Sequence, residues 1–412
     1  MQGQDSCRFC QTKISHSFCD LGLSPLANEL IDLKNAEKQE TLYPLHARVC
    51  SKCFLVQLPE LENPEVIFSN YVYFSSYSKS WLEHAEQYSE KVISRFSLNE
   101  NSRVVEIASN DGYLLKNFKK RGMKVLGIEP AGNVATVAMS SAGVPTLIRF
   151  FGTELADELV QSQNHADLLI GNNVLAHVPN INDFVDGMKR VLSKNGVITM
   201  EFPHLLNLIE KRQFDTIYHE HFSYLSFLTV QQIFAAHGLK LFDVEELPTH
   251  GGSLRIFGTH ADCKTHQEQP GVANLLKKEA AYGLGKIETY LSFQKEAEAV
   301  REGLVNFLQK CKREGKRVAG YGAPAKGNTL LNFSKVKTDL LPYTVDISPY
   351  KQNKFLPGVR IPVFAPEKIQ AEKPDFVLLL PWNIKNEIVT QMSFIREWGG
   401  KFVVPLPTLE IF

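Results

Sequence analysis

The sequence lacks the features that would assign it at once to several large classes of proteins. No apolar run in its 412 residues reaches the roughly 18 residues of a membrane span, and the opening MQGQDSCRFC has no apolar signal-peptide core. The 45 basic and 45 acidic residues cancel, and no long run of like charge favours a nucleic-acid partner. We therefore expect a soluble cytoplasmic protein that binds neither membranes nor nucleic acid.

A hydrophobic content of 44% over this length is enough for a substantial core, and about 100–200 residues per domain predicts roughly two to four domains. In a reducing compartment, the 7 cysteines need an explanation other than disulfides. Cys7, Cys10, Cys50 and Cys53 form two CxxC pairs, which together can complete a tetrahedral, structural Zn²⁺ site. The long gap between the pairs predicts a small structured insert.

The segment 104–130 has the order of a βαβ unit: an apolar strand, a tight turn, a helix and a second strand, Lys124 to Ile128, that ends in Glu129. Its turn lacks the GxGxxG pattern that binds a pyrophosphate and holds two acids, Glu106 and Asp111, instead. Acids repel phosphate and suit a cation. S-adenosylmethionine is such a ligand, and Glu129 can bind its ribose diol. An ordinary βαβ unit with a solvated turn is the alternative.

The residues expected to contact this cofactor lie at the ends of strands, where open α/β sheets bind ligands. They are Glu106, Ser109, Asn110, Asp111, Gly112 and Glu129, with Asn172 and Asn173 at the end of the strand in ADLLIGNN. His177 lies just beyond that strand, where a histidine is either structural or functional.

The segment FDTIYHEHFSYLS has the most unusual composition in the chain. A histidine such as His221 can take a proton, Glu220 can fix its tautomer, and Tyr218 can donate to a developing oxyanion. His219 and His221 share a face of an extended segment, but a metal site would need further ligands that nothing nearby clearly provides. The alternative is a turn whose polar groups satisfy buried backbone.

The helix and two strands that follow are predicted to form an antiparallel edge of the same sheet. His250 and Arg255 lie in and just after the loop between the two strands, which is either a ligand-binding loop or a plain hairpin. Upstream, Tyr71 and Tyr73 belong to a tyrosine-rich segment that either lines a polar pocket or packs as a connector.

A second βαβ unit begins with KRVAGYGAPAKGNTLLNF, and its turn is basic rather than acidic. Lys326 enters the start of the helix, where backbone amides and the helix dipole favour an anion. A diphosphate fits there, and a structural repeat without a ligand is the alternative. The expected substrate contacts are His250, Arg255, Tyr321, Lys326, Asp346, Lys351 and Asn353.

The paired CxxC motifs and the blocks EIASNDG, LAHVPN, IYHEHF, HGGSLR, GYGAPAK and DISPYKQNKFLPG occur in this order along essentially the whole chain. In these blocks the chain resembles the bacterial sugar C-methyltransferases that build branched deoxysugars. The resemblance implies a zinc domain, an S-adenosylmethionine domain and a C-terminal domain that helps to hold a dTDP-linked 4-ketosugar. It also implies catalytic roles for Tyr218, Glu220, His221, His177 and one of Tyr71 and Tyr73.

We therefore predict an α/β protein with a zinc-binding module at 1–75, a Rossmann-like S-adenosylmethionine-dependent methyltransferase domain at 76–270, a helical connector at 271–315 and a Rossmann-like nucleotide-sugar-binding domain at 316–412. The expected reaction transfers a methyl group to a carbon, C-3, of a dTDP-linked 4-keto-deoxysugar through an enolate. The alternatives are methylation of a nucleotide sugar at oxygen or nitrogen, and a non-catalytic nucleotide-sugar-binding protein.

Overall fold

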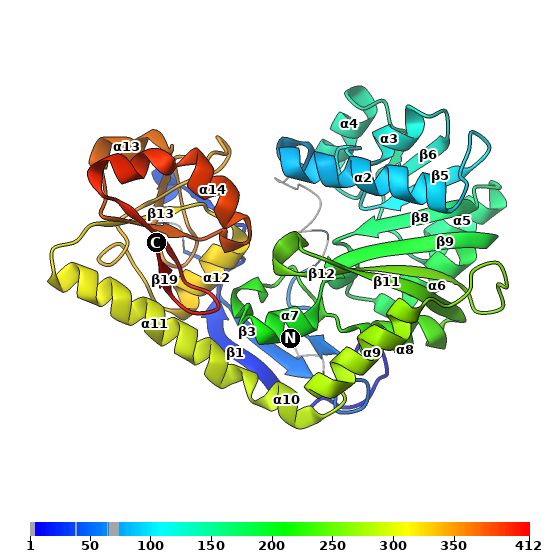
Figure 1. Ribbon diagram of the computed structural model, residues 1–412, viewed down its shortest axis with the longest axis horizontal. Coiled ribbons are helices and arrows are strands. Elements are labelled where there is room, and N and C mark those ends of the chain that lie inside the picture. The colour runs from blue at the N-terminus through cyan, green and yellow to red at the C-terminus, as the bar shows by residue number, and fades with distance from the viewer. Residues whose placement is uncertain (1–4, 38, 64, 66–73) are drawn as a thin grey trace.

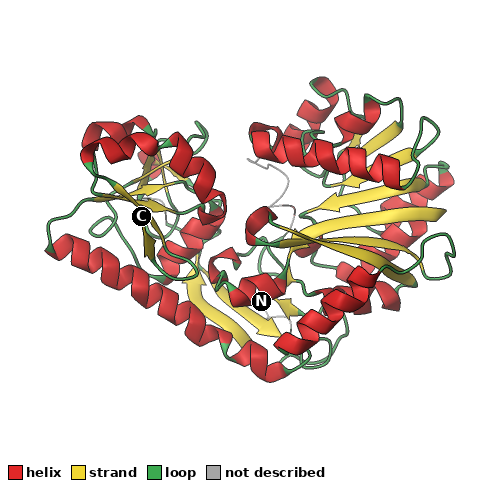
Figure 2. Ribbon diagram, in the orientation of Figure 1, coloured by secondary structure: helices red, strands yellow, loops and turns green. Residues whose placement is uncertain are grey.

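The computed structural model describes residues 5–37, 39–63, 65 and 74–412. In these residues the strands form three sheets, one in each of two lobes and a smaller one between and beneath them (Figure 1). No helix in this part of the chain is long and apolar enough to cross a membrane. The alternation of helices and strands confirms the predicted α/β class (Figure 2).

The central sheet has the strand order β11-β12-β9-β8-β5-β6-β7, in which β5 to β9 are parallel and β11 and β12 form the predicted antiparallel edge. Its strands are β5 (Arg103–Ile107), β6 (Lys124–Ile128), β7 (Thr146–Leu147), β8 (Ala166–Asn172), β9 (Leu192–Pro203), β11 (Leu239–Leu247) and β12 (Ser253–His260). The helices of this lobe are α2 (Lys79–Arg95), α3 (Leu115–Lys119), α4 (Gly132–Ser140), α5 (Thr153–Gln161), α6 (Ile181–Val191), α7 (Leu205–Glu210) and α8 (Phe227–Ala236).

Alternating side chains of these strands point to opposite faces and build two cores. Val104 and Leu168 pack against α2 and α3 on one face, whereas Val105 and Leu169 pack against α5, α6 and α8 on the other. Both faces are thus covered, so the carboxyl ends of the parallel strands are the edge where polar side chains can gather around a ligand.

The C-terminal sheet repeats this plan with the order β19-β18-β17-β13-β14-β16-β15-β2. Its strands are β13 (Val318–Tyr321), β14 (Thr344–Val345), β15 (Lys354–Phe355), β16 (Pro362–Phe364), β17 (Phe376–Leu379), β18 (Lys401–Val404), β19 (Glu410–Ile411) and β2 (Ile31–Asp32). Its helices are α12 (Ala325–Phe333), α13 (Glu367–Glu372) and α14 (Lys385–Gln391). The second βαβ unit, β13-α12-β14, therefore forms as the sequence indicated.

The small sheet joins the lobes because strands are shared between them. It has the order β1-β3-β4-β10, with β1 (His16–Ser24), β3 (Tyr43–Val49) and β4 (Val56–Gln57) from the N-terminal module and β10 (Ser223–Tyr224) from the segment after His221. In return, β2 of the N-terminal module pairs with β15 of the C-terminal sheet. The limits of the domains are still predictions. Across these limits, β10 and β2 each pair with a strand from another predicted domain.

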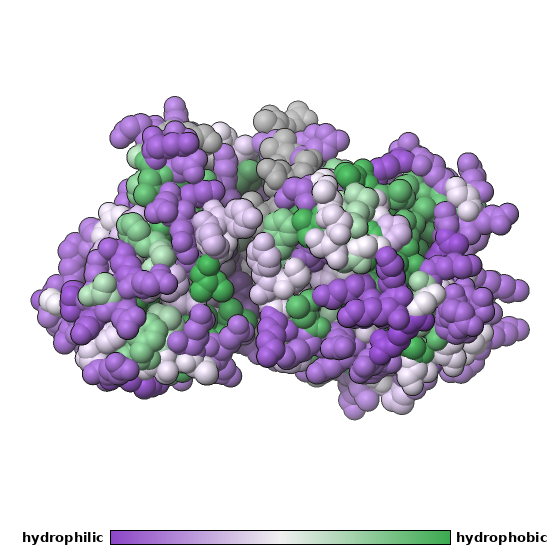
Figure 3. Space-filling view, turned by 90° about the horizontal axis from the view of Figure 1, so that it is seen from above, coloured by the Kyte–Doolittle hydropathy of each residue, from purple (hydrophilic) through white to green (hydrophobic). Residues whose placement is uncertain are grey.

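The connector consists of α9 (Pro270–Tyr282), α10 (Ile287–Leu291) and α11 (Phe293–Arg313), and it runs beneath the molecule from the central lobe to the C-terminal lobe (Figure 1). Along α11, Val300, Leu304 and Leu308 are buried in a core shared with β1 and the C-terminal sheet. From above, the surface is hollowed between the two lobes (Figure 3).

Candidate active site

The four cysteines of the CxxC pairs gather into one cluster, with all four sulfur atoms within 4.8 Å of one another. The Sγ atoms of Cys7 and Cys53 are 3.5 Å apart, as are those of Cys10 and Cys50. Tetrahedral zinc with Zn–S bonds of about 2.3 Å needs sulfur atoms about 3.8 Å apart, so the cluster fits the ion. Four thiolates leave no open position, which makes the zinc structural.

The turn after β5 bends through left-handed backbone conformations, with φ of 55° at Ala108, 49° at Asn110 and 76° at Gly112. Glycine is the residue that usually adopts such angles, and asparagine is the side chain that tolerates them best after it. The side chains of Asn110 and Asp111 are held by the backbone N–H groups of Ser75 and Ser76, at 2.9 and 3.0 Å. The short helix η2 (Ser75–Tyr77) is thereby fastened to the turn.

Unpartnered buried polar atoms concentrate in this turn. Both carboxylate oxygens of Glu106, the hydroxyl of Ser109 and Oδ1 of Asp111 are buried and accept or donate no hydrogen bond in the structure. Burial and the neighbouring charges of Asp111 and Glu129 raise the pKa of Glu106 well above its usual value. Such a group is costly unless a polar or cationic ligand satisfies it, so the turn fits the ammonium and sulfonium of S-adenosylmethionine.

Glu129 follows β6 at the edge of the sheet next to this turn. Its two carboxylate oxygens accept hydrogen bonds from the backbone N–H groups of Asn110 and Ala131, both at 2.9 Å. Burial raises the pKa of Glu129, and these two N–H groups oppose the rise. The carboxylate is therefore fixed in orientation, as a group that binds a ribose diol must be.

Replacing Glu129 by alanine should weaken the binding of S-adenosylmethionine and S-adenosylhomocysteine to the same extent, about 10- to 100-fold, because both carry the same ribose. Isothermal titration calorimetry measures both affinities, with the exposed Glu100→Ala as the control. A loss confined to S-adenosylmethionine would mean that Glu129 senses the sulfonium and not the sugar.

The end of β8 brings a histidine of the β11–β12 loop to the same edge. Asn172 Nδ2 lies 3.4 Å from the hydroxyl of Tyr113, and Asn173 Nδ2 donates to Nε2 of His250 at 3.3 Å. The His250 ring also packs 5.4 Å from that of Trp81. His250 has a left-handed φ of 53°, and burial together with the charge of Lys326 lowers its pKa to about 4. His250, expected among the substrate contacts, thus lies beside the residues expected to bind the cofactor.

Arg255 Nη2 lies 2.9 Å from Nε2 of His84, whose ring stacks on Trp81. Arg255 is buried on β12, directly opposite Glu201 of β9, and the two side chains form an ion pair of 2.5 Å. Its guanidinium also covers the ring of Tyr88 at 4.4 Å. These contacts use the Arg255 charge inside the central lobe.

Two histidine rings lie 4.7 Å apart, His177 from the end of η3 (Leu175–His177) and His221 from the segment 214–226. Nδ1 of His221 donates to the carbonyl of Thr216, and Nδ1 of His177 donates to the carbonyl of Glu220, both at 2.8 Å. Thr216, not Glu220 as expected from the sequence, therefore fixes the tautomer of His221. Protonated Nδ1 leaves Nε2 of His221 as the proton-accepting atom.

Burial lowers the pKa of both rings, to about 4 for His177 and well below its ordinary value for His221, where the charges of His177 and Lys326 add to the effect. Both imidazoles are therefore neutral at neutral pH. The Tyr218 ring lies 4.0 Å from that of His221, centroid to centroid, and both residues are only partly buried. A phenol and a neutral imidazole thus stand side by side.

The remaining members of the YHEH motif turn away from this pair. His219 Nε2 donates to the carbonyl of Pro44 at 3.3 Å, and its ring packs against Tyr43. The carboxylate of Glu220 accepts two hydrogen bonds from Nδ2 of Asn28, at 2.7 and 3.0 Å. Across the described ranges, no group of three or more potential ligands other than the cysteine cluster gathers closely enough to hold a metal.

The C-terminal lobe contributes Lys326 to the same region. Its Nζ donates to Oδ1 of Asn383 at 2.8 Å and lies 4.6 Å from the ring of Trp382, whose Nε1 donates to Asp215 at 2.6 Å. Burial raises the pKa of Asp215 to about 6 despite the nearby charge of Lys326. The charge of Lys326 lowers the pKa of both His221 and His250, so a group of the C-terminal lobe acts on these two histidines.

The side chains of the other residues expected to bind substrate point to different partners. Asp346, after β14, accepts hydrogen bonds from the backbone N–H groups of Ala323 and Ser348, both at 2.8 Å, and its carboxylate lies 3.8 Å from Lys351 Nζ. In contrast, the hydroxyl of Tyr321 turns inward to Gln391. The backbone of Asn353 pairs with Val363 and Leu33.

Tyr71 and Tyr73 lie outside the described residues. Sequence reasoning missed Asn28, Thr216 and Asp215. Asp215 and Thr216 belong to the polar segment that the sequence singled out, whereas nothing near Asn28 marks it, because its partner Glu220 is 192 residues away in the chain.

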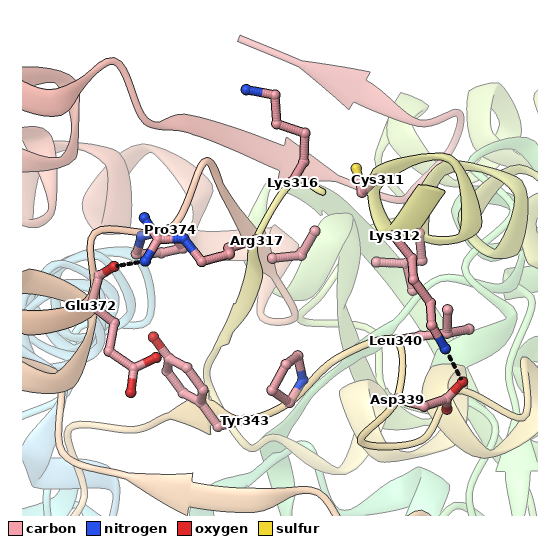
Figure 4. Close-up of a pocket in the computed structure, with 12 residues that line it drawn as sticks. Cys311, Lys312, Lys316, Arg317, Asp339, Leu340, Tyr343, Glu372 and Pro374 are labelled. Atoms are coloured by element: carbon pink, nitrogen blue, oxygen red, sulfur yellow. Dashed lines mark hydrogen bonds and ion pairs between the residues drawn. The ribbon is translucent and has the colours of Figure 1, made fainter. Parts of the chain in front are cut away.

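A separate cavity of about 180 Å³ lies between α11 and the C-terminal sheet (Figure 4). Its charges are already used: Lys312 binds Asp339 at 3.0 Å, and Arg317 donates to the carbonyls of Glu372 and Lys373. None of the expected site residues lines it.

Comparisons with known proteins cover the chain in three successive parts. Family models match residues 7–68 as a zinc binding domain, 81–244 as a methyltransferase domain and 248–407 as a C-methyltransferase C-terminal domain. The C-methyltransferase NovU of Streptomyces niveus is 36% identical over 403 residues, 98% of this chain and 96% of NovU.

Two solved structures match part of the chain. Magnesium protoporphyrin IX methyltransferase of Synechocystis, solved with bound S-adenosylhomocysteine, matches with 12% identity and a TM-score of 0.35, covering 43% of this chain and 83% of its own. The PH0226 protein of Pyrococcus horikoshii matches with 13% identity and a TM-score of 0.37, covering 48% of this chain and 99% of its own.

Proposed function

Because this chain belongs to the family of S-adenosylmethionine-dependent C-methyltransferases, we propose that its substrate is a nucleotide-linked 4-keto-deoxysugar and that the methyl group goes to C-3. We further propose dTDP as the nucleotide and branched deoxysugar synthesis as the pathway. The chain is a methyltransferase and not a non-catalytic binding protein.

The observation that carries the proposal is the position of His221 between two sets of groups. On one side, the His177 ring, which follows β8, lies 4.7 Å from the His221 ring, and the charge of His250 acts on His221 from the β11–β12 loop. On the other side, Lys326 of α12 bears on it from the C-terminal lobe. A cofactor held at the acidic turn and a diphosphate held near Lys326 would bring their reacting groups to this imidazole, so positioning supplies part of the rate enhancement.

The residues act on the sugar as follows. His221 Nε2 accepts the C-3 hydrogen as a proton, and the C–H electron pair moves to form the C-3–C-4 double bond of an enolate. Tyr218 donates a hydrogen bond to the enolate oxygen. The bound cofactor supplies an electrophilic methyl group on a sulfonium. C-3 would take this methyl group as the ketone reforms at C-4, and the S–CH₃ bonding pair would stay on sulfur.

The electrostatics of the basic turn support a diphosphate. Lys326 and Lys351 lie at the carboxyl edge of the C-terminal sheet, where α12 begins and β14 ends. Lys351 donates to the carbonyl of Ala323 at 3.0 Å, which leaves further N–H groups of its ammonium for a phosphate. The neighbouring acid, Asp346, has the place of a ribose-binding carboxylate, as Glu129 has in the central sheet.

The test is to incubate the protein with methyl-labelled S-adenosylmethionine and a panel of nucleotide-linked ketosugars that differ in nucleotide and in keto position. We expect label to appear on a sugar carbon, located by NMR, and only with 4-ketosugars. Transfer to oxygen or nitrogen, or to no member of the panel, would overturn the proposed function.

A further inference from the structure

The carboxylate of Glu220 is held by a residue from a distant part of the chain. Both of its oxygens accept from Nδ2 of Asn28, at 2.7 and 3.0 Å. We propose that Asn28 is a positioning residue for methyl transfer, which keeps the Glu220 carboxylate oriented and ionised while the backbone carbonyl of Glu220 holds the ring of His177. This inference rests on the proposed function, and it adds to that function a residue of the zinc-binding module.

Asn28 lies between two of the three sheets. It belongs to the loop between β1, a strand of the small sheet, and β2, a strand at the edge of the C-terminal sheet. Pro25, in the same loop, packs so closely on Gly358 that a Cβ atom added there would lie 3.1 Å from the proline ring. Leu33 N donates to the carbonyl of Asn353 at 3.3 Å on the other side of β2. The loop is thus anchored at both ends before it reaches Glu220.

The chemistry of this contact is one-sided. An amide NH₂ group can only donate, and the ionised carboxylate is the form that accepts most strongly at both oxygens. Glu220 is 6% exposed, and burial raises its pKa to about 7, while the hydrogen bonds of Asn28 and the charge of Lys351 oppose the rise. The carboxyl is therefore close to half ionised at neutral pH, where a small change in its partners changes its charge.

The charged and titratable groups around Glu220 come from each neighbouring element. Lys351 faces it from the C-terminal lobe and is itself near Asp346. His177, from the central sheet edge, binds the carbonyl of Glu220 and has a pKa of about 4. On its own segment, His219 and His221 are turned to other carbonyls. Asn28 is thus the neutral donor that reaches both oxygens of the carboxylate.

The experiment compares the pH dependence of kcat and kcat/KM for the wild type, Asn28→Ala and Glu220→Gln. We expect the wild-type rate to fall on the acid side near pH 7, and Asn28→Ala to move this fall upward by roughly 1 to 2 pH units, with the rate recovering at higher pH. Glu220→Gln should remove the fall, which separates it from the titration of Asp215, whose pKa is about 6.

Two further variants keep the test decisive. Asn182→Ala removes a comparable amide, which donates to the carbonyls of Arg8 and Phe9, and should leave the pH profile unchanged. Asn28→Ser keeps one donor and should shift the profile less than alanine does. A rate that falls equally at every pH in Asn28→Ala, or an unshifted profile, would overturn the inference.

A measurement without substrate distinguishes this inference from the proposed function. The ¹³C chemical shift of the Glu220 carboxyl, assigned by its loss in Glu220→Gln, reports the titration directly. A midpoint that rises in Asn28→Ala supports the contact even if no ketosugar is methylated. An unchanged midpoint overturns the Asn28 inference, even in a protein that methylates its sugar.

Discussion

Replacing His221 by asparagine should slow methyl transfer by about 10²- to 10⁴-fold, the range expected when a general base is removed. The ring is neutral because burial holds its pKa well below the usual value, and Thr216 holds Nδ1 so that Nε2 accepts the proton. Asparagine has no atom of comparable basicity. The rate is measured with saturating S-adenosylmethionine. The affinity for this cofactor should not change, because His221 is not part of the acidic turn that is expected to bind it.

The neighbouring His219 provides the matched control. It lies two residues from His221 but turns toward Pro44 and Tyr43 of the small sheet, so His219→Asn should change the rate only a few-fold. A loss of rate in His219→Asn as large as that in His221→Asn would show that any substitution in this segment slows methyl transfer, whether or not it removes a base. A His221→Asn enzyme with at least a tenth of the wild-type rate would exclude His221 as the base.

Removal of zinc should abolish methyl transfer while S-adenosylmethionine still binds. Phe54 N and Leu55 O, next to Cys53, bond with Cys50, and β4 follows at once and pairs with β10, two residues after His221. Structural zinc supplies much of the folding free energy of small cysteine-rich modules. Without zinc, β4 is no longer held in place in the small sheet. The segment that contains His221 then loses the strand that pairs with β10. The cofactor edge belongs to the central sheet, whose strands do not include β4 or β10.

The measurement uses Cys50→Ser and chelator-treated wild type, with zinc content by mass spectrometry, cofactor affinity by calorimetry, and turnover. Cys311→Ala, a buried cysteine on α11 outside the cluster, should keep zinc and activity. A zinc-free protein with full turnover would show that the segment around His221 does not need the metal. A loss of cofactor binding as large as the loss of turnover would show that the folding of the whole chain depends on zinc.

Much of the site was predictable because strand ends of parallel sheets converge. Glu106, Glu129 and Asn173 each end or follow an apolar run, and runs of this kind form the central sheet in the expected direction. The CxxC pairs were equally informative, since thiolates in pairs have few other uses in a reducing compartment. Both features are local in sequence, which is why a single chain reveals them.

What escaped prediction depends on register and on contacts between distant segments. Arg255 faces Glu201 and Glu245 across two antiparallel pairings, and no local pattern gives that register, so the sequence did not show that Arg255 forms an ion pair within the sheet. The strands β2 and β10, with two residues each, are too short to show a period. Asn28 lies in the loop before β2. Because β2 could not be predicted from the sequence, the contact between Asn28 and Glu220 could not be predicted either.

The most direct test of the central claim is hydrogen exchange at the sugar carbon in D₂O, with S-adenosylhomocysteine bound so that no methyl group can be transferred. If His221 removes a proton next to a ketone, NMR will show that the wild type incorporates deuterium at C-3 of a dTDP-4-ketosugar. The same exchange should be much slower with His221→Asn. Methyl transfer to carbon by an enzyme that exchanges no hydrogen there, or exchange that is equally fast in His221→Asn, would contradict the account.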